Sequence, residues 1–264
     1  MHLSRTARNL LRLAAGAGLA FLYLPLVIVL VLSFNSSRTF SWPPDGFTLH
    51  WWGQAAHNEG VRAALWTTLK VAAAATAFAL VIGTLASFAV QRYRFFGREV
   101  VSFIVILPIA LPGIVTGLAL NSAFRQASIG LGYFTLIVAH ATFCIVLVYN
   151  NVIARLRRLA PSVEEASMDL GGDLFQTFRH VTFPLVRSAL FAGGLLAFAL
   201  SFDEIVVTTF TAGAGIETLP QWIFNNLFRP NNLPVVNVVA TAVVVLSIVP
   251  VWLAQRLTSE VHVT

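Results

Sequence analysis

Long apolar runs are the feature of this sequence that most limits what it can fold into. A helix that crosses the hydrocarbon core of a bilayer needs about 20 apolar residues. Six runs reach that length, and they lie near residues 11–34, 63–90, 99–121, 133–153, 185–211 and 235–255. The sequence therefore predicts an all-α, polytopic membrane protein with six transmembrane helices, forming a single domain over residues 1–264.

The composition supports a membrane protein and excludes several other classes. Of the 264 residues 57% are hydrophobic and only 11% are charged, whereas soluble domains carry about 25% charged residues. The single cysteine, Cys144, excludes a disulfide framework and a cysteine-based zinc cluster. The net charge of +6 could indicate nucleic-acid binding. However, the basic residues flank the apolar runs instead of forming one patch, so no nucleic-acid partner is predicted.

The placement of the basic residues predicts how the chain crosses the membrane. The first run follows Arg5, Arg8 and Arg12, as in a signal peptide, but it is long for one and lacks a clear cleavage site. We interpret it as a retained signal anchor. With the N-terminus inside, the cytoplasmic segments hold twelve of the 17 basic residues. Because Lys and Arg are enriched on the cytoplasmic side, both termini are predicted to be cytoplasmic.

A polar segment, residues 155–184, separates the fourth and fifth runs and is predicted to lie on the cytoplasmic side. Ser162 followed by Glu165 has the form of a capping box, which begins a short helix. The Gly171-Gly172 pair is expected to end this helix, because glycine readily adopts the left-handed conformation.

A second short helix is predicted after the glycine pair. Asp173 can cap it, and it is expected to run to about His180. Pro184 then marks a break before the fifth span. The segment is therefore predicted to form a helix, a tight turn and a second helix along the membrane face.

The spacing of residues in this segment resembles the cytoplasmic EAA loop of binding-protein-dependent ABC importer permeases. Glu165-Ala166-Ser167 is followed after three residues by Gly171, and after nine more by Val181-Thr182-Phe183-Pro184. Ser167, Val181 and Phe183 depart from the family pattern but roughly keep size and polarity. The resemblance implies a permease of the type I importer fold. It also implies that Glu165, Ala166, Ser167, Gly171 and Pro184 belong to a coupling loop in a groove of the ATPase. Taken singly, Glu165 could be only a cap and Gly171 only a helix stop.

Two adjacent acids, Asp203 and Glu204, interrupt the fifth apolar run. A charge at the centre of a transmembrane helix costs about 2.5–3.5 kcal/mol, so such acids usually face a water-filled path or a partner. On one continuous helix Ser201, Glu204 and Thr208 would form a polar stripe. The pattern predicts a path for a cationic or amine-bearing solute. Alternatives are an ion pair with Lys70 or protonation of one acid.

The resemblance extends over nearly the whole chain and is most specific around the acidic pair. The segments 33–35, 46–49, 200–207 and 218–220 are similar to the spermidine/putrescine subclass, and within it to the second of two non-identical permease subunits. This implies a bacterial inner-membrane importer of polyamines or related amine solutes, with 4-aminobutyrate as an alternative. The implied partners are a second permease in a heterodimer, a periplasmic solute-binding protein and an ABC ATPase dimer that holds ATP and magnesium.

The remaining signals are weaker. The predicted outer loop contains Trp42, Trp51 and Trp52, which fit an interfacial belt or a docking surface for the binding protein. Lys70 is the only lysine and follows a leucine, which excludes a P-loop, so no ATPase site or other enzyme activity is predicted. His140 and Cys144 are one helical turn apart and are interpreted as a packing face, since two ligands make a poor metal site. A self-sufficient channel or secondary carrier is the alternative class.

Overall fold

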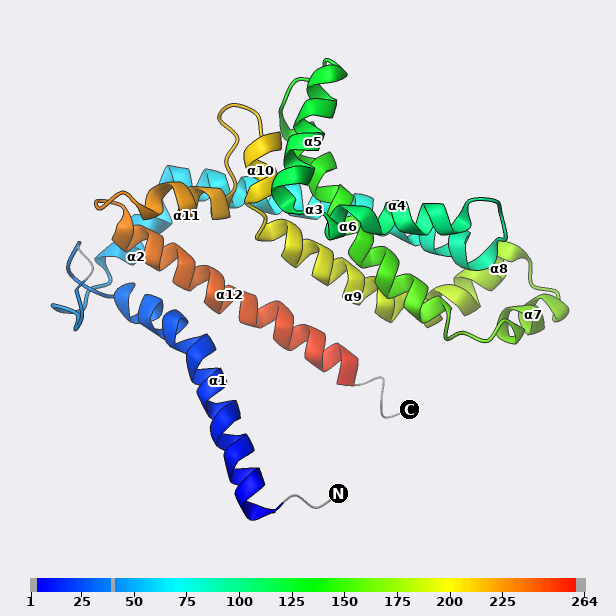
Figure 1. Cartoon of the computed structure of the whole chain (residues 1–264), viewed down its shortest axis with the longest axis horizontal. Helices are drawn as coiled ribbons and strands as arrows, with labels where there is room; N and C mark the ends of the chain where they lie inside the picture. Colours follow the sequence, from blue (N-terminus) through cyan, green and yellow to red (C-terminus); the bar gives the residue numbers. More distant parts are fainter. Residues whose placement is uncertain (1–3, 39–40, 260–264) are drawn as a thin grey trace. The chain divides into compact units, whose positions relative to one another are not determined.

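The computed structural model describes residues 4–38 and 41–259, with side chains described as far as Ile248. Within this part the chain is built of helices, and the extended pairing it contains is an isolated bridge between Asn35 and Phe47. Figure 1 shows the elements, which are α1 (Arg5–Leu32), α2 (His50–His57), α3 (Glu59–Arg92), α4 (Arg98–Ala110), α5 (Gly113–Gln126), α6 (Tyr133–Leu156), α7 (Ser162–Asp169), α8 (Leu174–Thr177), the π-helix η1 (Phe178–Thr182), α9 (Phe183–Phe202), α10 (Val206–Thr211), α11 (Leu219–Leu227) and α12 (Leu233–Ser259).

The six predicted runs are all helical, but two of them are broken. By length and composition α1, α3, α6 and the continuous Leu174–Phe202 can cross a membrane. The pair α4 and α5 passes the same test only together, because the chain bends by 111° between the two helices. The predicted kink of the third span is therefore a full interruption. In the sixth run, α12 has 27 residues, and Leu233–Ile248 is its apolar part with described side chains.

The chain divides into two compact units. The first comprises Met1–Arg62 with Trp222–Leu253, and the second comprises Ala63–Gln221 with Ala254–Thr264. The prediction of one permease domain over residues 1–264 stays a prediction.

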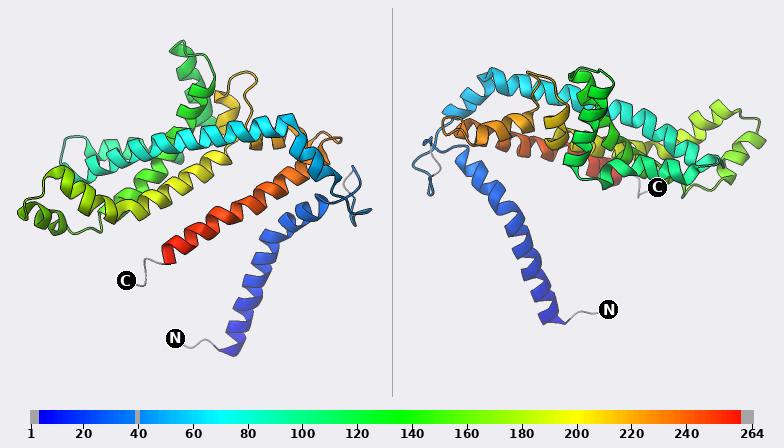
Figure 2. Two further views of the ribbon diagram at one scale, coloured as in Figure 1. Left: turned by 180° about the vertical axis from the view of Figure 1, so that it is seen from behind. Right: turned by 45° about the horizontal axis from the view of Figure 1, so that its top comes forward.

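The second unit is organised around α6, which α3 and α9 accompany in both views of Figure 2. Glycines allow the close approach. A Cβ atom at Gly83 of α3 would lie 2.9 Å from the carbonyl oxygen of Ile145, and one at Gly193 of α9 would lie 3.1 Å from the Cα atom of Val148. Small residues at such contacts are typical of helices packed in lipid, where close van der Waals contact stabilises the association.

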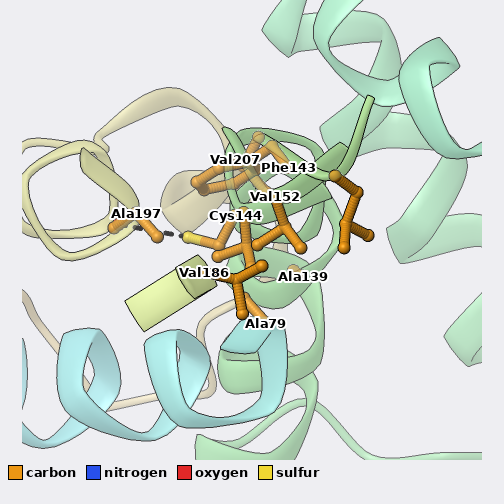
Figure 3. Close-up of a cluster of buried hydrophobic side chains, with 10 residues drawn as sticks. Ala79, Ala139, Phe143, Cys144, Val152, Val186, Ala197 and Val207 are labelled. Atoms are coloured by element: carbon orange, nitrogen blue, oxygen red, sulfur yellow. Dashed lines mark hydrogen bonds between the residues drawn. The ribbon is translucent and has the colours of Figure 1, made fainter. Parts of the chain in front are cut away.

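The core of the second unit is an apolar cluster drawn from several of these helices. Figure 3 shows Ala79 of α3, Cys144 and Val152 of α6, and Val186 of α9 within it. The Cys144 thiol donates a hydrogen bond to the carbonyl oxygen of Ala197 at 3.3 Å. This packed framework carries both segments in which the sequence predicts function, the 155–184 loop and the acidic pair.

The first unit contains α1, α2, α12 and the loop between α1 and α2. The Thr241 hydroxyl of α12 donates a long hydrogen bond, 3.4 Å, to the Val29 carbonyl near the end of α1. Towards its N-terminus α1 diverges from α12 (Figures 1 and 2), and most of its apolar side chains are exposed. An apolar surface this long is expected to meet lipid or another subunit.

Candidate functional site

The end of α7 has the conformation that the sequence predicts for the glycine pair. Gly171 has φ of +89°, in the left-handed region. The Gly171 N–H donates to the carbonyl of Met168 at 2.9 Å, and the Gly172 N–H donates to that of Ser167 at 3.0 Å. These two bonds form a Schellman motif, which satisfies carbonyls that the helix leaves free. The predicted tight turn is confirmed.

The beginning of α7 differs from the prediction. The helix is preceded by Pro161, and no side chain caps its first turn. The Glu165 N–H donates to the Pro161 carbonyl at 3.2 Å. The predicted capping box of Ser162 and Glu165 is therefore wrong, because Ser162 is already the first residue of the helix, whereas the box needs it as the non-helical cap. The Glu165 and Ala166 side chains are exposed instead.

The second helix is capped as predicted but does not stop where predicted. The Asp173 carboxylate accepts from the Gln176 N–H at 2.7 Å, and the Gln176 side chain accepts from the Asp173 N–H at 3.1 Å. From there α8 passes through η1 directly into α9. Pro184 lies in the first turn of α9, so the predicted break there is wrong. A proline donates no backbone hydrogen bond, and the wider π turn before it accommodates that loss.

The acid that ties this loop to the rest of the unit is Glu164. It forms an ion pair with Arg92, the last residue of α3, and accepts a 2.6 Å hydrogen bond from the Thr182 hydroxyl of η1. Both charged side chains are largely buried, with 19% of Glu164 and 27% of Arg92 exposed. The Ser167 and Thr177 hydroxyls are hydrogen-bonded at 3.0 Å, which joins α7 to α8. These bonds hold α7, α8 and η1 as one body attached to α3.

The turn between α7 and α8 presents an apolar tip. The exposed fractions are 91% for Leu170, 81% for Leu174 and 68% for Phe175. Each sits beside the sharp corner that Gly171 makes. Exposed apolar patches of this kind occur at protein–protein and membrane contact sites. Ser167, in contrast, is partly buried against Thr177, which gives it a structural role in the corner.

The fifth run is interrupted at the acidic pair. The helix α9 ends at Phe202 and α10 begins at Val206. The Glu204 carboxylate accepts from the Val207 N–H at 2.7 Å and so caps α10. The Asp203 side chain is exposed, and among the described residues no hydrogen bond or ion pair to it is found. The Lys70 ammonium lies over the ring of Trp66, 5.8 Å from its centre, so the alternative ion pair with Lys70 is not formed.

Because the helix is broken, Ser201, Glu204 and Thr208 do not form the predicted stripe. Ser201 and Thr208 are buried, and both contact His140 of α6. The distance from His140 Nδ1 to the Ser201 oxygen is 2.8 Å, and that from Nε2 to the Thr208 oxygen is 2.9 Å. His140 is completely buried, as the predicted packing face requires. It is in addition the polar partner of both helix ends at the break.

The interruption between α4 and α5 lies beside the break in the fifth run. A Cβ at Gly113, the first residue of α5, would lie 3.5 Å from a methyl of Val206, the first residue of α10. One turn on, a Cβ at Gly117 would lie 2.6 Å from the Phe210 ring. The Asn121 side-chain amide donates to the Phe210 carbonyl, a role that its position near the end of a span did not indicate. The two broken helices are therefore packed tightly together.

The predicted aromatic docking residues have different environments in the first unit. Trp42 is 62% exposed. Trp51 is buried, and its indole N–H donates to the Asn35 carbonyl at 2.9 Å. Trp52 stacks on Phe34 with ring centres 5.4 Å apart. Beside Trp51 a cavity of about 360 Å³ opens, lined mainly by polar side chains, which include Arg38, Gln54, His57, Asn58, Asn231 and Asn232.

Among the described residues no cluster of three or more His, Cys, Asp or Glu side chains could hold a metal ion. His140 and Cys144, the pair that sequence spacing singled out, each bond to other partners.

Apolar helices that are broken within the membrane-spanning part of the chain are typical of membrane transport proteins. The family of binding-protein-dependent transport system inner membrane components matches residues 79–263, and the chain belongs to this family. As a member it is an inner-membrane transport component and not an enzyme.

Relatives in the family cover most of the chain. It is 34% identical over 234 residues to the putrescine transport system permease protein PotI of Escherichia coli, covering 86% of this chain and 82% of PotI. It is 36% identical over 242 residues to the spermidine/putrescine transport system permease protein PotC of the same organism, covering 91% of this chain and 90% of that PotC. The Haemophilus influenzae PotC is 35% identical over 242 residues, covering 91% of this chain and 93% of the relative.

Solved structures share the fold. A bacterial ABC transporter involved in import of the acidic polysaccharide alginate has a chain with a TM-score of 0.69 at 20% identity, covering 98% of this chain and 99% of that one. An amino acid ABC transporter solved with histidines gives a TM-score of 0.56 at 16% identity, covering 80% and 100%.

Proposed function

We propose that this chain is one permease subunit of an ATP-driven, binding-protein-dependent importer of polyamines, with putrescine and spermidine as substrates. The observation that carries the proposal is the exposed carboxylate of Asp203 at the break between α9 and α10. A carboxylate in an apolar run needs a cationic partner or water, and a polyamine supplies ammonium groups. The named transport functions of PotI and PotC, at 34% and 36% identity, support this substrate class.

In the proposed mechanism, Asp203 and Glu204 line the path along which the cation passes. Asp203 is free to meet an ammonium group, while Glu204 caps α10 and adds negative charge beside it. Interrupted helices place polar groups at membrane depth only where they line a cavity or are buried in protein. Both acids lie at such an interruption, between α9 and α10, and this supports the proposal.

The same proposal assigns the 155–184 loop to coupling with an ATPase dimer that binds ATP and magnesium. The apolar tip of Leu170, Leu174 and Phe175 supplies the contact area, and exposed Glu165 supplies a charge at its side. Glu164 joins this contact to α3 through Arg92, so a movement of the ATPase reaches a membrane helix. Rigid-body movement of packed helices is an established route to alternating access.

The remaining partners follow from the family. A second, non-identical permease is proposed to form a heterodimer with this chain, and a periplasmic solute-binding protein is proposed to deliver the solute to the loop around Trp42. We propose that the loop of residues 155–184 and both termini lie in the cytoplasm of a bacterium, which the distribution of basic residues supports.

The substrate is tested by uptake of labelled putrescine, spermidine and 4-aminobutyrate by cells that lack other carriers and express all subunits. We expect ATP-dependent uptake of a polyamine, which Asp203→Asn with Glu204→Gln lowers at least about tenfold, as removal of a paired charge costs well over 1.4 kcal/mol. Glu99→Gln is the matched control, because Glu99 is an exposed acid in the first turn of α4, outside the proposed path. Uptake of a polyamine that the double variant leaves unchanged would show that the acids do not line the path.

The coupling role is tested by retention of the ATPase on the purified permease complex. Leu174→Ser with Phe175→Ser is expected to reduce retention and to abolish ATP-driven uptake. Phe96→Ser is the control, because Phe96 is a fully exposed aromatic residue on the loop between α3 and α4, which is predicted to face the same side. Equal retention in both variants would remove the apolar tip from the coupling surface.

A further inference from the structure

A buried histidine spans the break at the acidic pair. His140 lies in the middle of α6 and is fully buried. One ring nitrogen contacts Ser201 in the last turn of α9, and the other contacts Thr208 in the first turn of α10. The two hydroxyls belong to different helices, so one imidazole ring connects the two ends that the break separates.

The neighbouring hydrogen bonds define the direction of these contacts. The Thr208 hydroxyl donates to the Glu204 carbonyl at 2.9 Å, so its oxygen is left to accept from His140 Nε2–H. A neutral imidazole has one donor and one acceptor. We therefore assign Nδ1 as the acceptor of a hydrogen bond that Ser201 donates. The chain of bonds runs from Ser201 through His140 and Thr208 to the backbone of Glu204.

The surroundings leave these groups few other partners. The His140 ring lies against Phe143, with ring centres 5.4 Å apart, and next to the apolar cluster of α6. Removal of the imidazole would leave two buried hydroxyls, at Ser201 and Thr208, to find new partners. Unpaired buried polar groups are costly, so the helix ends would be expected to move.

We propose that His140 is a positioning residue that holds the break in the conformation that presents Asp203 and Glu204 to the solute. Its hydrogen bonds among the described residues go to Ser201 and Thr208, so it acts through the two helix ends. The inference rests on the proposed function, in which the acids line the substrate path. It adds that a residue of α6 positions the two acids. His140 is 61 residues from Ser201 and 68 residues from Thr208 in the sequence.

The experiment is a double-mutant cycle on ATP-driven putrescine uptake by the complete transporter. His140→Leu is combined with the intact acids and with Asp203→Asn plus Glu204→Gln. With intact acids we expect His140→Leu to lower uptake about tenfold, the factor that corresponds to about one lost buried hydrogen bond. With the acids neutralised it should lower the residual uptake by less than about twofold, because residues that act through one another are not additive.

His140→Gln is the conservative variant, since an amide offers one donor side and one acceptor side. With intact acids, His140→Gln should keep more than half of the native uptake, whereas His140→Leu should lose most of it. Equal losses from His140→Leu in both backgrounds would overturn the inference and leave the substrate path intact. If the acid variant alone transports like the native protein, the substrate path fails instead. The two failures are thus distinguishable.

A thiol-labelling measurement covers the cases in which uptake is abolished or His140→Leu does not fold. Asp203→Cys is labelled with a water-soluble maleimide, and the native Cys144 is buried and stays silent. Adding Thr208→Val, which removes one link of the chain, should change the labelling rate of Cys at this position about threefold or more. A Gly130→Cys control, in an exposed loop, should keep its rate. An unchanged rate at position 203 would overturn the inference.

Discussion

The molecule contains two pairs of adjacent acids, and in both pairs one side chain is bonded within the chain while the other is exposed. In Glu164-Glu165 the first carboxylate is bonded inside the unit and the second is exposed. In Asp203-Glu204 the second is bonded and the first is exposed. In each pair, one carboxylate is bonded within the chain and its neighbour is exposed.

The pairs differ in what the inner acid holds. Glu164 bonds to Arg92 of α3 and Thr182 of η1, so it joins separate elements. Glu204 bonds to the N–H of Val207, three residues on, so it only caps the next helix. The loop is therefore fastened to the bundle by a charge pair, whereas the break depends on α6 for its connection. The comparison teaches that the proposed coupling loop and the proposed solute path are held in place by different kinds of bond.

The largest effect is expected where the inner acid joins elements. Glu164→Lys places a cation against Arg92 and leaves the Thr182 hydroxyl without its acceptor. The free energy of unfolding of the purified transporter, measured by denaturing-detergent titration, should fall by about 3 kcal/mol. Combining it with Arg92→Glu should restore at least half of the loss. If the swap restores nothing, the ion pair does not hold the loop.

The corner of the loop gives the next largest effect. Gly171→Ala puts a Cβ on a residue with φ of +89°, which costs about 1.5 kcal/mol for a residue other than glycine. The same titration measures it, and ATP-driven uptake should fall with it because the corner positions the apolar tip. Gly130→Ala is the control, with open space around its Cβ and no positive φ. Equal stability of the two variants would contradict the assigned turn.

A smaller effect is expected where the inner acid is only a cap. Glu204→Ala removes the acceptor of the Val207 N–H, and loss of a cap costs about 1 kcal/mol. Glu204→Gln keeps an oxygen acceptor and should retain most of that stability. If both variants lose as much as Glu164→Lys, then Glu204 holds more than its own helix and the contrast between the pairs is broken.

The two outer acids should have the smallest effect on stability. Glu165→Gln and Asp203→Asn change exposed groups, so each should alter the free energy of unfolding by less than about 0.5 kcal/mol. The two variants should instead differ from the native protein in function, and each should affect a different function. Glu165→Gln should weaken ATPase retention, and Asp203→Asn should lower uptake while the ATPase stays bound. Loss of stability in either variant would mean that the acid is not free.

The sequence predicted what depends on local chemistry. The apolar runs identified the helices, Asp173 identified a cap, and the glycine pair identified the turn at Gly171, because each depends on residues within a few positions. The capping box at Ser162 failed for a local reason, since Pro161 keeps the helical conformation. The continuity through Pro184 was missed because a π turn has no simple sequence signal.

What the sequence could not predict depends on contacts between distant residues. Arg92 and Glu164 are 72 positions apart, and His140 is 61 and 68 positions from its hydroxyl partners. The break at residues 203–205 lies in a run of apolar and β-branched residues that reads as one helix. The sequence signal for this break was the acidic pair itself. A pair of adjacent charges in an apolar run indicates a break in the helix at least as well as it indicates a polar stripe on a continuous helix.

The π-helix η1 also lets the chain hold one extra residue without turning the loop. One residue turns an α-helix by about 100°, and a π turn holds roughly one more residue than an α turn. Deleting one residue within Phe178–Thr182 would therefore turn η1 into an ordinary α-helical turn and leave α8 on nearly the same side of the axis of α9. If all five residues of η1 were α-helical instead, α8 would be rotated by about 100° around that axis, and Leu174 and Phe175 would face another side.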